Sequence, residues 1–199
     1  MALLAVLLTS VLLLAYGLAT SFMAKTELEI ASADRSGREA AYAADGALQA
    51  AVAELAGGWD GVLDGSRTSV FQDATLSPAI DGTGRRMDLG ARTAVLQAAS
   101  DSAPTGTDRV QWRLFAWGPA SMLLSPPASV GPFYLAVWFA DDSGDGDGVP
   151  SADANGIVIV HAEAYGAGGL LRAVECVVSR TPTTGSRPML LSWRELRPI

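Results

Sequence analysis

The sequence has few of the residues on which enzymes and disulfide-stabilised domains depend. Cys176 is its one cysteine, so no disulfide can form within the chain. His161 is its one histidine, and the chain has neither a G-x-S-x-G sequence nor cysteines and histidines at metal-ligand spacing. We therefore predict that the chain is not an enzyme and that Cys176 is a small buried apolar residue. We interpret His161 and Glu163, which share a strand face, as an exposed pair.

Positive charge is also scarce. Lysine and arginine number 14 against 21 aspartates and glutamates, which gives a formal net charge of −7. Binding to nucleic acid depends on basic patches, and an acidic protein surface disfavours it. We therefore exclude nucleic acid as a partner.

Charge is absent altogether from residues 1–24, MALLAVLLTSVLLLAYGLATSFMA, and Lys25 follows directly. At ~1.5 Å per residue, such a helix is long enough to cross the ~30 Å hydrocarbon core of a bilayer. No basic residue precedes the apolar run, as one would in a signal peptide or a signal anchor. We therefore expect that a short basic leader has been removed and that Met1 begins a processed chain. The alternative is an ordinary single-span anchor.

Residues 25–56 keep a helical composition, rich in alanine, glutamate and leucine and free of proline. Apolar residues recur there at spacings of three and four and define one face: Ala41, Ala44, Leu48, Ala51, Val52 and Leu55. Gly57 and Gly58 are a strong stop signal. We predict one helix of roughly 55 residues and about 80 Å, lipid-facing in its first half and amphipathic in its second. The alternative is two helices broken near Ser36–Gly37.

Residues 57–199 form a domain of ordinary size, which we expect to be a β-rich globular head. The stretch 59–86 has little periodicity and predicts loops. Alternating or continuous apolar runs predict strands at Arg109–Leu114, Phe133–Ala140, Ile157–Tyr165, Leu170–Ser179 and Met189–Leu196, with a hairpin at GAGG. The predicted fold is α+β, with an antiparallel sheet of four to six strands packed on the amphipathic half of the helix.

Tryptophans fall into two groups along this head. Trp112, Trp117 and Trp138 lie in strand patterns, so we expect them in the core. Trp59 and Trp193 lie apart from the clearest strands, and we interpret them as markers of a contact surface.

An acidic, glycine-rich loop, ADDSGDGDGVPSADANG, joins two of the predicted strands. Hard cations such as calcium take six to eight oxygen ligands, and loops of this composition supply them. We therefore name a candidate calcium site on Asp141, Asp142, Asp145, Asp147 and Asp153. The spacing starts like an EF-hand loop, but Ala152 stands where that loop needs a bidentate glutamate. The alternative is a solvated hairpin loop. No cofactor is required by the sequence.

An uncharged N-terminal span that continues into an amphipathic helix and a β-rich head resembles type IV pilin-like proteins. The details are similar to the PilX-type minor pilins, which begin with a G-x-A-L-L run and carry an A-x-x-A-[ED]-[AG]-x-L signature. Here the run is MALLAVLL, and the signature is AYAADGAL, Ala41–Leu48, with Asp45 in the glutamate place. The resemblance is clearest over residues 1–55 and weaker in the strands of residues 155–180.

One departure concerns the early glutamate of most type IV pilins, four residues after the first mature residue. Ala5 stands there, and no acidic residue precedes Glu27. In the family that glutamate pairs with the N-terminal amine of a neighbouring subunit, so that the buried positive charge of the amine is compensated. A subunit without it should be poor at repeating along a filament, so the resemblance implies a place at or near the tip.

The resemblance implies a structural protein that supports pilus assembly, adhesion or motility. Its implied partners are other minor pilins, the major pilin and a tip adhesin, and no nucleic acid. Before assembly the protein would sit in the inner membrane with its head outside the cytoplasm, and afterwards in the surface pilus. One alternative is a minor pseudopilin of a type II secretion system, of the GspK type, although those carry larger heads. Another is a membrane-tethered extracytoplasmic ligand-binding domain.

Overall fold

The computed structural model describes residues 2–59, 61–80, 85–102, 106, 108–124, 131–180 and 188–197. Met1 of the expected span, and Asp60 and residues 81–84 of the expected loops, lie outside the described residues. The chain divides into two compact units, Met1–Arg38 and Glu39–Ile199.

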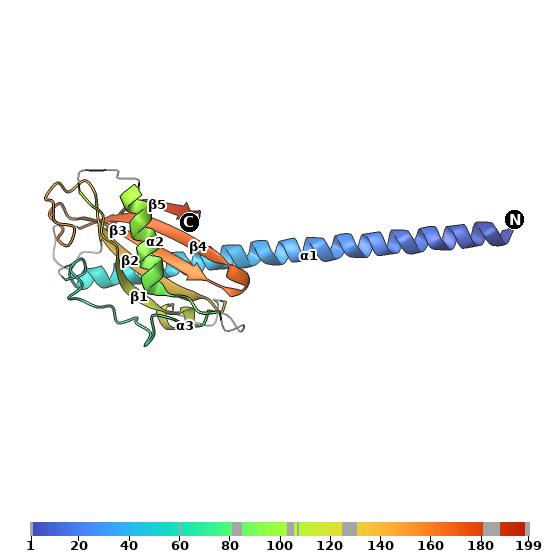
Figure 1. Cartoon of the computed structure of the whole chain (residues 1–199), viewed down its shortest axis with the longest axis horizontal. Coiled ribbons are helices and arrows are strands. Elements are labelled where there is room, and N and C mark those ends of the chain that lie inside the picture. The colour runs from blue at the N-terminus through green and yellow to red at the C-terminus, as the bar shows by residue number, and fades with distance from the viewer. Residues whose placement is uncertain are drawn as a thin grey trace. The chain divides into compact units, whose positions relative to one another are not determined.

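The first unit is the N-terminal part of helix α1, Ala2–Glu54 (Figure 1). The helix runs through Ser36–Gly37 without a break, so the two-helix alternative is wrong. Side chains 2–35 are all exposed, and the helix is long and apolar enough to cross a membrane. The few polar groups in its apolar part bond within the helix: Thr9 Oγ1 donates to the Ala5 carbonyl at 2.8 Å, and Ser10 Oγ donates to the Val6 carbonyl at 2.9 Å. Such internal bonding keeps hydroxyls compatible with an apolar surrounding.

The second unit is built on a five-stranded antiparallel sheet with strand order β1-β2-β3-β4-β5, which confirms the predicted architecture. The strands are β1 Arg113–Pro119, β2 Tyr134–Asp141, β3 Ile157–Tyr165, β4 Leu171–Ser179 and β5 Met189–Leu196. Short helical segments lie at η1 Leu55–Gly57, α3 Ala120–Leu123 and η3 Ala167–Gly169. The last of these forms the predicted hairpin between β3 and β4.

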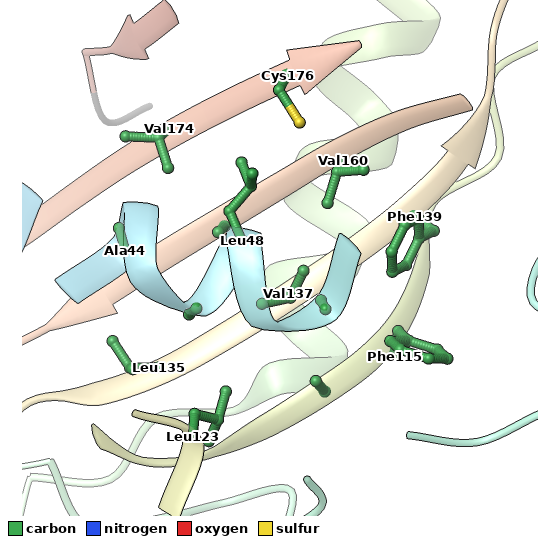
Figure 2. Close-up of a cluster of buried hydrophobic side chains, with 14 of the residues drawn as sticks. Ala44, Leu48, Phe115, Leu123, Leu135, Val137, Phe139, Val160, Val174 and Cys176 are labelled. Carbon is green, nitrogen blue, oxygen red and sulfur yellow. The ribbon is translucent and has the colours of Figure 1, made fainter. Parts of the chain in front are cut away.

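The C-terminal part of α1 packs on one face of this sheet, as predicted. Ala40, Ala44 and Ala47 are fully buried, and side chains this small let a helix backbone approach a sheet closely. Leu48 belongs to the same core, and Figure 2 shows it among strand side chains that include Val137 and Val160. The strand side chains of this core include Leu135, Val137, Phe139, Val158, Val160, Val174, Cys176 and Val178. Cys176 is therefore the buried apolar residue that the sequence predicted.

Helix α2, Leu89–Ser102, packs on the opposite face of the sheet (Figure 1). This helix was not predicted from the sequence. Because both faces are covered, all eight residues of β2 are buried. Only Leu89 and Leu96 of α2 are buried, so the helix has little of the apolar periodicity by which helices are recognised. One local signal was present: Asp88 Oδ1 accepts a hydrogen bond from the Ala91 amide at 3.0 Å, as an N-cap residue does.

Helix α2 also explains why the predicted strand Arg109–Leu114 is wrong in its bounds. Gln97 Oε1 accepts from the Trp112 amide at 3.1 Å, and Gln97 Nε2 donates to the Val110 carbonyl at 2.8 Å. These backbone groups bond to the helix instead of to β2, so the ladder begins only at Arg113. Trp112 and Trp138 are buried as expected, and Trp117 is half-buried.

The end of α1 is held by the loop that follows it. Gly58 has a φ of 128°, which favours glycine and ends the helical path as predicted. Arg67 donates from Nη2 to the Glu54 carbonyl at 2.6 Å and from Nη1 to the Gly58 carbonyl. The guanidinium thus satisfies carbonyls that a helix end leaves unpaired.

Candidate functional sites

A network of charged side chains lies under α2, on the face of the sheet that the sequence predicted to be exposed. His161 is 3 % exposed and Glu163 is fully buried, so the interpretation of these two residues as an exposed pair is wrong. The physical reason is α2, whose Arg92 reaches Glu163 with Nε 2.9 Å from Oε2. His161 Nε2 lies 3.0 Å from Glu163 Oε1, and the Tyr165 hydroxyl donates to Oε2.

The network continues across β4 to β5. Glu175, opposite His161 in the sheet, lies 3.6 Å from His161 Nδ1, and Arg194 Nη2 donates to Glu175 at 2.6 Å. Sequence reasoning missed Arg92, Glu175 and Arg194. Arg92 lies 71 positions before Glu163, so no local pattern links the two. The alternation of residues 161, 163 and 165 on one face was the one available signal.

Burial and the neighbouring charges shift the pKa values in this network in opposite directions. Burial opposes charge on Glu163, but hydrogen bonds from His161 and Arg92 outweigh it and lower the pKa of Glu163 to about 2. Burial alone would lower the pKa of His161, yet Glu163 and Glu175 outweigh it, and the net shift is upward. Glu163 thus connects Arg92 of α2 to His161 of the sheet, and these contacts anchor α2 to the sheet. Arg92 and Tyr165 also line a pocket of about 300 Å³.

The acidic loop between β2 and β3 brings three of the five predicted ligands together. One carboxylate oxygen from each of Asp141, Asp145 and Asp147 lies within 4.8 Å of the other two. Asp142 and Asp153 are not part of this group. Asp142 accepts from Asn155 Nδ2 at 2.7 Å and from the Gly144 amide at 3.0 Å.

Asp153 and Asp141 differ from ordinary loop aspartates in their burial. Asp153 Oδ1 accepts from the Gly156 amide at 2.6 Å, and burial raises the pKa of Asp153. Burial, and then the charges of Asp145 and Asp153, raise the pKa of Asp141 to about 7. Burial and the neighbouring aspartates thus disfavour the ionised form of Asp141.

The two tryptophans predicted at a contact surface lie at different places in the head. Trp193, on β5, is 49 % exposed, and its Nε1 donates to Asp45 Oδ1 at 2.8 Å. This hydrogen bond connects Asp45 of α1 to Trp193 of β5. Beside this contact is a groove of about 590 Å³, lined by apolar side chains of α1 and β5 that include Leu48, Val52 and Leu190. Trp59 is half-buried and lines a separate pocket of about 270 Å³ near the end of α1.

Cys176 has no features of a reactive thiol. It is 1 % exposed and faces the α1-side core. Burial raises the pKa of the thiol to about 12, which leaves almost no nucleophilic thiolate at neutral pH.

Comparisons with models of protein families, with curated proteins and with solved structures return no match to this chain.

Proposed function

We propose that this chain is a minor pilin of a type IV pilus, a tip or priming subunit that supports pilus assembly and adhesion or motility. The observation that carries the proposal is the two-part character of α1. Its residues 2–24 are uncharged and exposed, while one face of its C-terminal part, from Ala40 to Ala51, belongs to the core of an antiparallel head.

Each part of this helix has a role in the proposal. An exposed surface of 23 uncharged residues from Ala2 to Ala24 is unstable in water and needs a bilayer or other helices around it. A pilin uses both in turn, the inner membrane before assembly and the neighbouring subunits' helices afterwards. Ala5 and the absence of any acidic residue before Glu27 support a capping or priming position over the filament body. Other minor pilins, the major pilin and a tip adhesin are the proposed partners.

The membrane step is tested by a pair of matched substitutions on one helix. Leu12 and Leu28 are both exposed leucines of α1, at 69 % and 72 %, but only Leu12 lies inside the uncharged stretch. An arginine near the centre of a span costs about 3 kcal/mol of insertion free energy. We expect Leu12→Arg to lower the membrane-bound fraction in cell fractionation and Leu28→Arg to leave it unchanged. Equal membrane binding by both variants would mean that residues 2–24 do not span the bilayer.

The pilus step is tested in the cells that make the protein. Deleting its gene should reduce the number of surface filaments, and plasmid-borne wild-type protein should restore it. An epitope-labelled chain should appear at a few sites per filament in immunogold electron microscopy. Uniform labelling along filaments would contradict the tip position, and normal piliation with a loss of protein secretion would favour a pseudopilin.

A further inference from the structure

Asp141, the last residue of β2, has a side chain in an unusual position for a carboxylate. It is 1 % exposed, and its Oδ1 accepts a hydrogen bond from the Asp142 amide at 3.0 Å. Its Oδ2 is buried and has no hydrogen-bond partner among the described residues. Buried polar atoms are satisfied in the great majority of cases, and a buried carboxylate without a partner is costly. The described residues offer no group that satisfies this atom.

Asp145 and Asp147 repeat the pattern of one satisfied and one open oxygen. The Ala154 amide donates to Asp145 Oδ2 at 2.8 Å, and the Val149 amide donates to Asp147 Oδ1 at 2.7 Å. The second oxygen of each accepts no hydrogen bond from a described residue. No arginine or lysine in the described part of the chain forms an ion pair with any of the three aspartates. The three carboxylates thus face one another without a positive charge between them.

The spacing of these oxygens fits a single ion. Calcium binds carboxylate oxygens at about 2.3–2.6 Å, so two ligands of one ion lie at most about 5 Å apart. The three aspartates present oxygens within 4.8 Å of one another, inside that limit. Carboxylates are the ligands of hard cations such as calcium and magnesium, and not those of soft metals.

We propose that the loop between β2 and β3 binds one hard divalent cation through Asp141, Asp145 and Asp147. The cation satisfies the open oxygen of Asp141 and removes the repulsion among the three charges. With three protein carboxylates, and water for the remaining positions, affinity belongs to the weak range of extracellular calcium modules, a Kd of about 10⁻⁴–10⁻³ M. A bound cation would then hold Asp145 and Asp147 of the acidic loop next to Asp141 at the end of β2.

The chain supplies its own control for the test. Asp142 is adjacent to Asp141 and carries the same charge, but both of its oxygens already accept hydrogen bonds, from Asn155 and from Gly144. A diffuse attraction of cations to an acidic loop would depend on Asp142 as much as on Asp145. A site formed by Asp141, Asp145 and Asp147 depends on Asp145 and Asp147 but not on Asp142. Asn replacements keep the shape of each side chain and remove its charge.

The experiment is a thermal-unfolding titration of the full chain in an uncharged detergent, stripped with chelator and followed by tryptophan fluorescence. Calcium chloride is added from about 10 µM to about 20 mM at constant ionic strength, and magnesium chloride in a parallel series. We expect the Tm of the wild type to rise with the logarithm of the calcium concentration once this exceeds the Kd, by at least about 4 °C at the highest concentration. Asp145→Asn and Asp147→Asn should each raise the Kd fitted to the Tm series at least tenfold, while Asp142→Asn should change it less than twofold.

Two results would overturn the proposal. One is a Tm that does not respond to either cation, and the other is an equal loss of response in Asp142→Asn and Asp145→Asn. If both cations raise the Tm and both effects depend on the same aspartates, the cation with the lower fitted Kd is the better fit to the site. The result is independent of the pilin assignment, because it is read from the head's stability alone.

Discussion

Replacing Glu163 by glutamine should destabilise the head more than any comparable change of charge on its surface. Glu163 is fully buried and receives Arg92 from α2, together with His161 and Tyr165 from its own strand. Glutamine has nearly the same shape, so packing is kept. It removes the negative charge that Arg92 contacts, and it turns an Nε2 donor toward groups that themselves donate.

The loss of unfolding free energy in Glu163→Gln can be estimated in two ways. The pKa of Glu163 lies near 2 against an ordinary value of 4.5, and a difference of that size corresponds to about 3 kcal/mol in favour of the charged form. Removing one partner of a buried ion pair generally costs about 3–5 kcal/mol. We therefore expect a loss of about 3 kcal/mol. With an m-value of about 2 kcal/mol/M, the urea midpoint should fall by about 1.5 M.

The assay is urea unfolding at neutral pH, followed by tryptophan fluorescence, on a truncated protein that begins at Lys25. Residues Glu39–Ile199 form one compact unit, so this truncation keeps the whole head. The matched control is Glu195→Gln on β5. Glu195 is half-exposed and lies 3.9 Å from Arg172, and such surface pairs contribute about 0–1 kcal/mol.

A double-mutant cycle separates the ion pair from the rest of the network. Arg92→Met in the Glu163→Gln background should cost much less than Arg92→Met in the wild type, because the counter-charge is already gone. The reasoning would be refuted if Glu163→Gln lost no more stability than Glu195→Gln, or if the two substitutions at Arg92 and Glu163 were additive.

Four further expectations follow from the same structure. The stabilisation by Glu163 should be present above pH 4.5 and disappear as the pH falls toward 2, because its folded pKa is lowered; urea midpoints measured across that range test this. Leu48→Ala should cost about 2–5 kcal/mol in the same unfolding assay, because Leu48 is 2 % exposed in the α1-side core. Asp88→Ala should cost about 1 kcal/mol by removing the cap of α2, with Asp88→Asn losing less. Cys176 should react with a maleimide only after unfolding, and rapid labelling of the native protein would contradict its burial.

Much of the architecture could be predicted because it depends on local patterns. The uncharged run, the three-and-four spacing that follows it and the Gly57–Gly58 stop define α1 without tertiary information. Strands β2 to β5 are likewise visible as apolar runs between turn residues, within one residue of their bounds. A period of two or of 3.6 is a property of the backbone, and one window of sequence is enough to display it.

What tertiary structure decided was which groups meet across long separations. Helix α2 has little apolar periodicity, yet it packs on one face of the sheet and buries His161 and Glu163, which the strand alternation places on that face. The sequence of the acidic loop contains five candidate aspartates, but the path of the backbone brings only Asp141, Asp145 and Asp147 together. Burial and convergence are properties of the packed chain, because each depends on residues tens of positions away or on the path of a loop, and neither leaves a period in the sequence.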